Sequence, residues 1–456
     1  MTTHLPSALL LVFSVAFTLA CSAEEKLPYD LSQETYKTET LFSAQSITRH
    51  GSGESETAVY KGSAYGIYMR VGDERVMVVK APLDGSKAVT LPLIAVEDPN
   101  REKTKGYTAS GDNHTVYIIA VDRAGYIHVC GGMHSSKIVY WRSDKPEDIS
   151  SFTRIMPDAK LPERTQPCPI AGSITFPEFH SDRHGQLFWT ALQGCGPLCS
   201  YDETKKLWTA FGNPLDAIGE NKKRKSDDIS FYYTDKTGHD TTDTSVVKGG
   251  LSQKKFKVAW DRNGRMHMVF GLLNRHIYIG DRGSAHSVLY AYSDDGGKTV
   301  HKSNGEPIQL PITPDAGPHQ GEVITSKGNN MGRIVVDKAN RPMIWFTSGT
   351  GDHYGAGDHC VRLESGRWVE VASAPRGGDL DPNGVMICKD DKQDRDGLTR
   401  YWGPDLRNSR HLDFPVTGYD PEYYRDTGEL VWTSLKGDTD KATYIIHRTV
   451  FDRVSK

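Results

Sequence analysis

The segment Asp122-Arg-Ala-Gly125-Tyr-Ile-His-Val129 carries the pattern that decides the fold of this chain. It opens with an aspartate, places a glycine three residues later, and continues into alternating apolar side chains. Aspartate commonly heads a tight turn, and glycine adopts the positive φ that such a turn requires. Alternation with a period of two is typical of a strand. The segment therefore predicts a tight turn that leads into a β-strand.

The same pattern returns at Asp182 and Asp261, a weaker copy with Asn340 in place of the glycine begins at Asp337, and another begins at Arg425. Successive copies start 60 to 88 residues apart, whereas a four-stranded propeller blade takes about 40–50 residues. Further alternating segments follow most copies, for example Ser287–Tyr292 and Thr443–His447. The spacing predicts an all-β propeller with long loop insertions, in which some blades lack the pattern.

A second turn motif, Ser293-Asp-Asp295-Gly-Gly297-Lys-Thr299, matches the Asp-box pattern S-x-D-x-G-x-T. In this box the aspartate hydrogen-bonds the turn amides, and Gly297 permits a left-handed backbone. The motif resembles the box that closes hairpins in BNR-repeat propellers, which include both catalytic and non-catalytic proteins. It therefore supports the propeller fold without specifying a reaction.

The N-terminus has the features of an export signal. Ser7 to Ala20 is almost wholly apolar, and small residues follow it. The run is too short to span a bilayer as a mature helix, and its end fits a cleavage zone. We therefore expect a signal peptide over residues 1–23 and an exported protein, secreted or periplasmic. Thr18-Leu-Ala-Cys21 also resembles a lipoprotein signal, so a lipid anchor at Cys21 is the alternative to plain cleavage after Ala23.

The remaining chain is interpreted as an N-terminal arm over residues 24–41 and a single propeller domain over residues 42–456. Its formal net charge is −3 and it has no basic stripe, which argues against a nucleic-acid partner. No second apolar run predicts a transmembrane span. We expect a monomer whose partner is a polysaccharide or oligosaccharide.

Six cysteines remain when Cys21 is set aside from the seven in the chain. An even number permits disulfides in an exported protein, but their pairing is not readable from the sequence. Cys168, Cys195 and Cys199 could form a zinc site with His180, although disulfides or buried thiols are the simpler interpretation of this loose spacing. A structural Ca²⁺ in a propeller loop also stays open, and no metal ligands are assigned. The chemistry considered below requires no cofactor.

The strongest candidate site combines two histidines in the second quarter of the chain. His114 ends the segment Gly111-Asp-Asn-His114, just before an alternating strand, and His134 follows a glycine pair 20 residues later. Both stand at corresponding ends of neighbouring predicted strands, so two imidazoles could face one groove. Histidine can donate or accept a proton near neutral pH. By contrast, His128 and His267 alternate with apolar neighbours and are interpreted as packed side chains.

The stretch from Tyr107 to Phe211 resembles a group of BNR-type seven-bladed propellers that includes ulvan lyases, rhamnosyl-glucuronate lyases and a related α-L-rhamnosidase family. The run from Gly125 to Ser150 is close to the family pattern. The resemblance implies seven blades and a cleft lined by the residues that match His114 and His134. It also implies β-elimination on a rhamnose-rich polysaccharide that contains uronic acid.

Such a lyase must neutralise the substrate carboxylate, because the proton next to a charged carboxylate is hardly acidic. A base then removes that proton, and an acid protonates the leaving oxygen. We assign the base role to His134 or His114, and the other histidine would orient or neutralise the acid group of the substrate. Asn113, Arg142 and Arg275 are the candidate substrate-binding residues.

Two positions depart from the family pattern. The lyases carry a tyrosine in a T-Y-P-x-F motif, and the match in this chain is Thr175-Phe176-Pro177-Glu178-Phe179. They also carry an arginine a short way further on, where this chain has Ala191. Phe176 cannot transfer a proton, and Ala191 cannot bind a carboxylate. Either other residues replace them or the lyase chemistry has been lost.

Three functions therefore stay open. The leading one is a polysaccharide lyase or a derivative of one. The second is a glycoside hydrolase of the α-L-rhamnosidase type, for which the resemblance implies a histidine near position 50 that acts from the opposite face of the propeller, here His50. The third is a non-catalytic glycan-binding propeller, which Phe176 and Ala191 favour.

Overall fold

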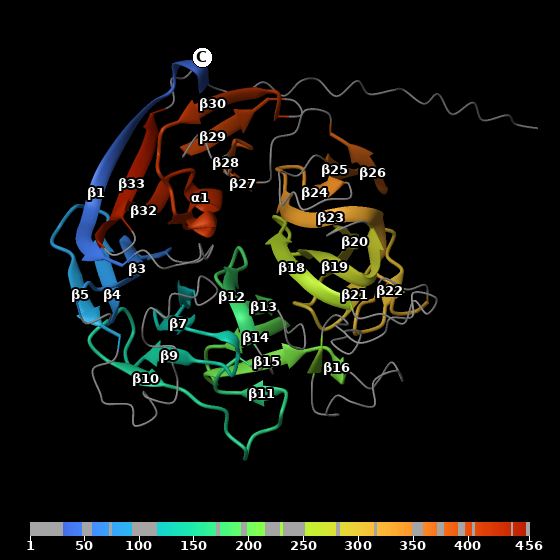
Figure 1. Cartoon of the computed structure of the whole chain (residues 1–456), viewed down its shortest axis with the longest axis horizontal. Coiled ribbons are helices and arrows are strands. Elements are labelled where there is room, and N and C mark those ends of the chain that lie inside the picture. The colour runs from blue at the N-terminus through green and yellow to red at the C-terminus, as the bar shows by residue number, and fades with distance from the viewer. Residues whose placement is uncertain are drawn as a thin grey trace, which may run out of the picture.

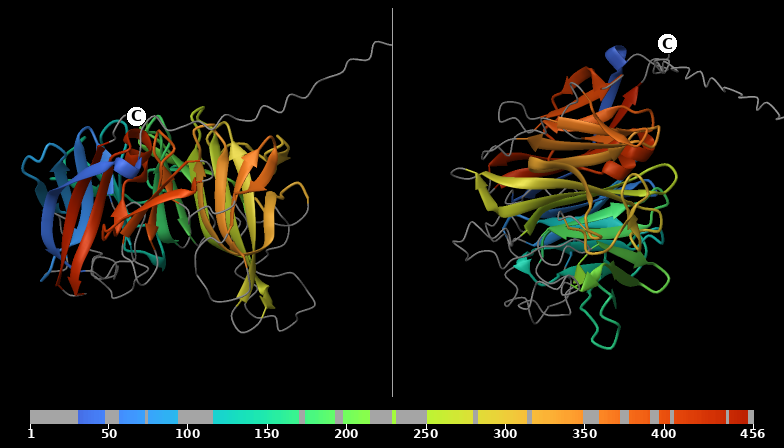
Figure 2. Two further views of the ribbon diagram at one scale, coloured as in Figure 1. Left: turned by 90° about the horizontal axis from the view of Figure 1, so that it is seen from above. Right: turned by 90° about the vertical axis from the view of Figure 1, so that its right-hand side faces the viewer.

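The computed structural model describes residues 31–47, 57–72, 75–93, 116–169, 174–192, 198–214, 229–230, 251–279, 283–313, 317–348, 359–371, 378–390, 397–403, 406–438 and 441–452. These residues form a seven-bladed β-propeller (Figure 1), as predicted. Seen from the side, the blade strands run between the two faces of the ring (Figure 2). All-β content and long connections between strands agree with the repeat spacing in the sequence.

Three blades are built from the N-terminal half of the chain. Blade 1 contains β2 (Thr57–Tyr60), β3 (Ser63–Met69), β4 (Val76–Pro82) and β5 (Val89–Pro92). Blade 2 contains β6 (Tyr117–Val121), β7 (Ile127–Gly131), β9 (Tyr140–Ser143) and β10 (Phe152–Arg154). Blade 3 contains β12 (Ile174–Ser181), β13 (Leu187–Leu192), β14 (Leu198–Asp202) and β15 (Leu207–Phe211), with β8 (His134–Ser136) and β11 (Thr165–Gln166) at its two edges.

The next two blades share one sheet, because β20 pairs with both β19 and β23. Blade 4 contains β18 (Leu251–Trp260), β19 (Met266–Ile279), β20 (Gly283–Ser293), β21 (Val300–His301) and β22 (Pro307–Ile308). Blade 5 contains β23 (Glu322–Val336), β24 (Pro342–Ser348), β25 (His359–Glu364) and β26 (Arg367–Glu370). A separate ribbon pairs β16 (Asn213–Pro214) with β17 (Ile229–Ser230).

The last two blades bring the chain back to its start. Blade 6 contains β27 (Asp379–Leu380), β28 (Met386–Asp390), β29 (Gly397–Trp402) and β30 (Asn408–Leu412). Blade 7 contains β31 (Gly418–Tyr419), β32 (Leu430–Asp438), β33 (Lys441–Asp452) and the N-terminal strand β1 (Thr35–Ser46). A single 3₁₀ turn, η1 (Leu31–Gln33), precedes β1.

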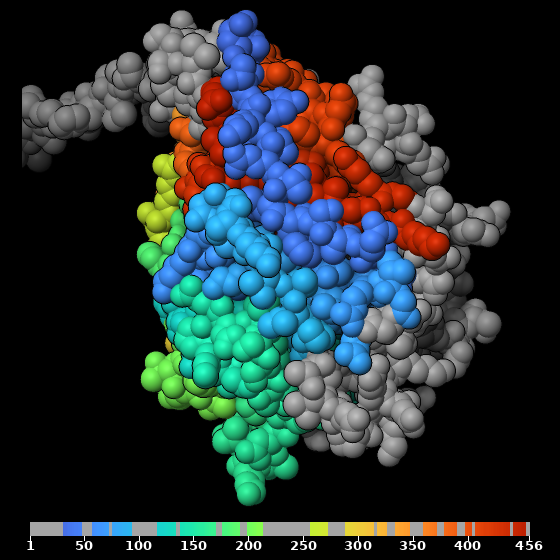
Figure 3. All heavy atoms as spheres, turned by 90° about the vertical axis from the view of Figure 1, so that its left-hand side faces the viewer, coloured from blue at the N-terminus to red at the C-terminus, as the bar shows by residue number. Residues whose placement is uncertain are grey.

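Strand β1 closes the ring. It pairs antiparallel with β33 from Thr35, opposite Asp452, to Ser46, opposite Ala442. Figure 3 shows this blue strand lying along the red C-terminal strands. The strand begins within the stretch 24–41 that the sequence analysis assigned to an N-terminal arm. Because the two ends of the chain share one blade, opening the ring requires the loss of a whole strand ladder.

The predicted Asp-headed turns are present after the innermost strands of blades 2 to 5. In the first of them the Gly125 amide donates to the Asp122 carbonyl at 2.9 Å, and Asp122 Oδ1 accepts from the Tyr126 amide at 2.8 Å. The same pair of bonds recurs in the turns at Asp182, Asp261 and Asp337. We call the face that carries these turns the turn face, and the face where the innermost strands begin the loop face.

One predicted copy of the turn is wrong, and one copy was missed. The segment Arg425–Gly428 is the end of a short helix, α1 (Pro421–Thr427), and Gly428 is its left-handed C-cap with φ 76°. The missed copy lies in blade 6 at Asp381–Gly384, where the Gly384 amide donates to the Asp381 carbonyl at 3.0 Å. Its sequence has proline in place of the basic residue, so the pattern did not detect it.

The Asp box forms the turn that its sequence predicts. Asp295 Oδ1 accepts from the Thr299 amide at 2.9 Å and from Ser293 Oγ at 2.8 Å. Gly297 has φ 101°, which only glycine adopts without strain. A side chain there would also lie 2.7 Å from Leu198 of blade 3, so the glycine lets two blades approach closely.

His128 and His267 are packed inside their blades, as predicted. His128 is fully buried, with Nδ1 2.6 Å from the Tyr140 hydroxyl and Nε2 3.2 Å from the Asp122 carboxylate. His267 repeats this arrangement, with Nδ1 2.7 Å from the Tyr290 hydroxyl. Burial lowers the pKa of both imidazoles, which keeps them neutral. They hold the turns in place and lie away from the channel.

Candidate functional site

The loop face brings three of the positions singled out in the sequence close together. Strand β8 pairs with the beginning of β12, so that His134 lies opposite Thr175. On the other side of β12, Thr175 lies opposite Leu192 and Pro177 lies opposite Ala191. His134, Phe176 and Ala191 therefore occupy adjacent strands at one end of blade 3, although 57 residues separate the first from the last.

Phe176 sits at an irregularity of β12. The register shifts between Thr175 and Pro177, and Phe176 has φ 49°, in the left-handed region that bulky residues seldom adopt. A bulge of this kind redirects a side chain and is common beside active sites. The strained backbone costs about 1–3 kcal/mol and persists only when its surroundings hold it. Blade 3 therefore presents the side chain of position 176 in a special orientation at the loop face.

The other predicted site residues are not gathered at this position by the described structure. His114, Asn113 and His50 lie outside the described residues, and Arg275 lies in β19, where only the backbone is described. The described strand ends on either side of His50, Ser46 of β1 and Thr57 of β2, are at the loop face. The pairing of His114 with His134 stays a prediction.

Arg142 belongs to a different region from His134. It lies in β9 opposite His128, near the turn face. Its Nη1 donates to the Tyr201 hydroxyl at 2.9 Å, and its guanidinium lies 6.0 Å from the ring of Tyr126. This side chain joins blades 2 and 3 and is engaged with protein partners.

A second region with charged side chains lies in the central channel, where α1 crosses from blade 7 to other blades. The Asp420 carboxylate caps the helix by accepting from the Tyr423 amide at 2.8 Å, and it also accepts from the Val59 amide of blade 1 at 2.6 Å. The Tyr424 hydroxyl donates to the Val385 carbonyl of blade 6 at 3.1 Å. The helix therefore holds three blades together across the axis.

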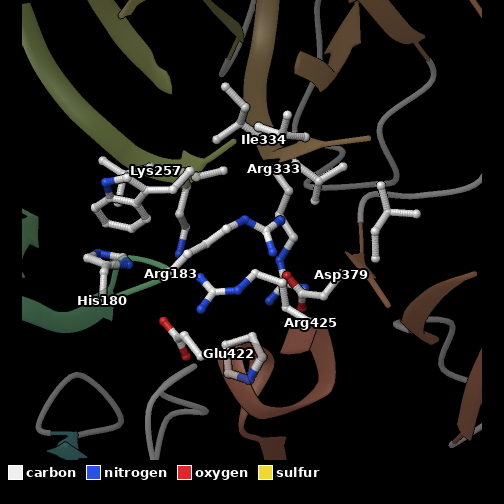
Figure 4. Close-up of a pocket in the computed structure, with 15 residues that line it drawn as sticks. His180, Arg183, Lys257, Arg333, Ile334, Asp379, Glu422 and Arg425 are labelled. Carbon is white, nitrogen blue, oxygen red and sulfur yellow. The ribbon is translucent and has the colours of Figure 1, made fainter. Parts of the chain in front are cut away.

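Two cavities lie on either side of α1. One is lined by the inner strands β2, β6 and β12, and the other by β12, β18, β23 and β27. The second cavity has an empty volume of about 720 Å³, part of it open to solvent. Its charged or titratable lining residues are His180, Arg183, Lys257, Arg333, Asp379, Glu422 and Arg425 (Figure 4). Four permanent cations thus share this cavity with two carboxyl groups.

Most of these cations have close partners. Lys257 Nζ, largely buried in β18, lies 2.7 Å from Glu178 Oε1. Arg333 Nη1 lies 3.0 Å from the Asp379 carboxylate. Arg425 Nη1 donates to the Ser181 carbonyl at 3.0 Å. The cavity wall is therefore organised by ion pairs between neighbouring elements.

Two carboxyl groups on and beside α1 have raised pKa values. Burial raises the pKa of Glu422 to about 8, and the nearby Asp420 carboxylate adds to the shift. Burial also raises the pKa of Asp420, to about 6, although the amides of Tyr423 and Val59 oppose it. A carboxyl group that stays protonated at neutral pH can act as a hydrogen-bond donor or a general acid.

The sequence does not predict this channel site. In the sequence, Arg183 is only the basic residue of a repeated turn, and Glu422 precedes a segment that resembles another such turn. Lys257 interrupts an apolar strand, Phe256-Lys-Val-Ala-Trp260, and a lysine in that position is the one available signal of a buried charge. No spacing rule connects residues of five different elements.

The metal hypothesis receives no support from the described residues, among which no group of three or more ligand side chains could hold an ion. Cys168 and Cys199 are buried there, and His180 Nε2 lies 2.9 Å from Thr190 Oγ1. Cys195, the remaining member of the predicted zinc set, lies outside the described residues. Within the described part of the chain, no helix has the length and apolar character needed to cross a membrane.

Comparisons with known proteins agree with the observed architecture. Residues 65–374 match a family model described as "BNR repeat-containing family member". The structure is similar to that of polysaccharide lyase Uly1, at 16% identity over 88% of this chain and 90% of that chain, with a TM-score of 0.60. A PL25 ulvan lyase, also solved bound to -[GlcA(1-4)Rha3S]-, is 12% identical over 90% of this chain and 96% of that chain, with a TM-score of 0.58. No curated protein sequence matches the chain.

Proposed function

Because this chain belongs to the BNR repeat-containing family, we propose that it acts at its loop face on a rhamnose-rich polysaccharide that contains uronic acid, as a polysaccharide lyase or a derivative of one. The proposal includes export through the signal at residues 1–23, with a lipid anchor at Cys21 as the alternative to a free N-terminus. Export is consistent with a polysaccharide substrate, because large polysaccharides do not enter the cell intact.

The observation that carries the proposal is the register of β8 on β12. It sets the backbone of His134 beside the Phe176 bulge, with strand β12 between His134 and Ala191. These are the positions that the family resemblance assigns to a base, a phenol and a carboxylate-binding arginine. Similar solved structures include a polysaccharide lyase and an ulvan lyase bound to -[GlcA(1-4)Rha3S]-. Because these structures are similar at low sequence identity, they support the fold alone. The location of the site is supported by the local strand register.

The proposed reaction is a β-elimination. One histidine removes the proton next to the uronate carboxylate, the carbon–oxygen bond at the neighbouring ring carbon breaks, and a carbon–carbon double bond forms between the two ring carbons. The leaving oxygen takes a proton from the second histidine, because Phe176 has no hydroxyl to supply one. His114 and His134 are the proposed pair. The missing arginine lowers the acidity of the substrate proton and so predicts a slow enzyme.

The decisive experiment is incubation of the purified protein with ulvan and with rhamnose-capped glucuronans, followed by ultraviolet absorbance of the unsaturated uronate product. The His134→Ala variant should lose that signal. His184→Ala is the matched control, because His184 is exposed on the turn face. Polymer binding without any product from the wild-type protein would overturn the lyase proposal.

A glycan-binding role without catalysis is the second candidate, and the observation that favours it is the pair Phe176 and Ala191. A protein of this kind would bind the acidic polymer and release no product. The His134→Ala variant would then bind the polymer more weakly than the wild type. Release of free rhamnose without the chromophore, abolished by His50→Ala, would instead identify the hydrolase reaction.

A further inference from the structure

One cation of the channel cavity differs from its neighbours. Arg183 lies in the Asp-headed turn of blade 3 and lines the cavity from the turn face. Its nearest acidic partner is Asp426, whose Oδ1 lies 3.7 Å from Nη1 and also accepts from Arg425 Nε at 2.8 Å. Arg183 Nε is buried and has no hydrogen-bond partner among the described residues. The guanidinium is therefore partly buried, and it shares its one close carboxylate with Arg425.

Cations outnumber carboxyl groups in the lining of this cavity. Burial lowers the pKa of the Arg183 guanidinium and the charges of Arg425 and Arg262 lower it further, whereas the charges of Asp426 and Asp261 oppose this shift. Glu422, one of the two carboxyl groups in the lining, has a raised pKa and is largely uncharged at neutral pH. Figure 4 shows the side chains of Arg183, Arg333 and Arg425 extending into the same cavity. The local excess of positive charge would be relieved by an anion.

Arginine is well suited to such a ligand. Its planar guanidinium donates two parallel hydrogen bonds to a carboxylate or to an ester of sulfuric acid, and the bonds strengthen where water is excluded. Arg183 retains these donors, because its one ion pair is long and shared. Lys257 and Arg333 are paired with carboxylates and form the fixed wall around it.

We propose that this cavity binds an oxyanion, either a carboxylate or a sulfate group, with Arg183 as the principal ligand. The site lies beside α1 at the turn-face ends of β12, β18 and β23, and it is separate from the proposed loop-face site. The inference that a sugar carries the oxyanion rests on the proposed function. The inference that the cavity binds an oxyanion is independent of that function. A polymer held there would be anchored at a second point of the same molecule.

The test is calorimetric titration of the full chain with sodium sulfate and with sodium glucuronate at constant ionic strength, with rhamnose as the neutral ligand. We expect saturable binding of at least one anion, no binding of rhamnose, and at least tenfold weaker binding to Arg183→Gln. Lys338→Gln is the matched control, since Lys338 occupies the same place in the turn of blade 5, is exposed, and does not line the cavity. It should bind the anion as the wild type does.

Two outcomes would overturn the proposal. One is the absence of saturable binding of either anion, and the other is equal affinity of the wild type and Arg183→Gln for each anion. Arg183→Lys provides a second variant that keeps the charge and the fold, and it should bind several-fold more weakly because the bidentate geometry is lost. Tighter binding of glucuronate than of sulfate identifies a uronate as the ligand, and the reverse order identifies a sulfated sugar. A negative absorbance assay with intact anion binding would refute the lyase and leave this site standing.

Discussion

Ser181 at the end of strand β12 donates its backbone amide to Glu422 Oε1 of helix α1, at 3.2 Å. This bond joins blade 3 to an element of blade 7 across the central channel. Glu422 also lines the cavity that holds Arg183. The contact therefore links the stability of the ring to the protonation state of the Glu422 carboxyl group.

The titration of Glu422 should make the protein less stable as the pH rises from about 4.5 to about 8. Burial raises the pKa of its carboxyl group from 4.5 to about 8, so between these values the folded protein holds a proton that the unfolded chain has released. The free energy of unfolding should therefore fall as the pH rises through this window, by at most about 1.4 kcal/mol per pH unit. In Glu422→Gln the fall should be shallower, because the amide keeps the bond to Ser181 and does not titrate.

Urea denaturation at several pH values between 5 and 8 measures this slope. Glu306→Gln is the control, because Glu306 is exposed on another blade and should leave the slope unchanged. Identical slopes in wild type and Glu422→Gln would contradict the prediction.

Phe176→Tyr should increase lyase activity. The substitution restores a phenol at the bulge of β12, and a positioned acid or base is worth roughly 10²–10⁴-fold in rate. We expect at least tenfold faster release of unsaturated uronate, and a further gain when Ala191→Arg supplies the missing positive charge. Phe152→Tyr adds the same hydroxyl on the outer strand of blade 2 and should change nothing. Equal rates for Phe176→Tyr and wild type would show that position 176 does not take part in the reaction.

Arg400→Met should weaken the closure of the ring. Arg400 is buried, contacts the carboxylate of Glu34 just before β1, and lies 3.8 Å above the ring of Phe451. Removing it leaves a buried carboxylate without its partner, which typically costs about 3–5 kcal/mol. The double variant with Glu34→Gln should recover part of the loss. Chemical denaturation of the three variants measures the coupling, and additive losses would contradict it.

Asp295→Ala should cost about 1–2 kcal/mol, because three hydrogen bonds of the Asp box are lost. Burial acts to raise the pKa of Asp295, but hydrogen bonds from Thr299 and Ser293 outweigh it and the net pKa is lowered. Its stabilisation is therefore complete above the ordinary aspartate pKa of 3.8 and is lost as the pH falls below that value. Acid titration of stability should be flatter in Asp295→Asn than in the wild type.

Local patterns predicted the turns well, since each turn depends on a few consecutive residues. Asp122 with Gly125, and Asp295 with Gly297, contain both the side chain that accepts the bonds and the residue that permits positive φ. The error at Arg425 has the same origin, because Gly428 fits a helix C-cap as well as a tight turn. Only Asp420, which caps the start of α1, distinguishes the two readings, and it lies outside the repeated pattern.

The site was predictable in part. His134, Phe176 and Ala191 could be linked before the structure was known because they match motifs of one family. The cavity around Arg183 could not be found this way, because its residues come from blades 3, 4, 5 and 6 and from α1. Their charged side chains line one cavity only because the propeller brings strands from distant parts of the chain around one axis.

The sequence by itself determined the propeller, because turn chemistry and alternation act over spans of a few residues and are repeated along the chain. The tertiary structure decided how the ring closes, since β1 and β33 are brought together from opposite ends of the chain. It also decided that α1 divides the channel and that Arg183 lies partly buried beside other cations. These features depend on burial and on long-range proximity, which no local pattern encodes.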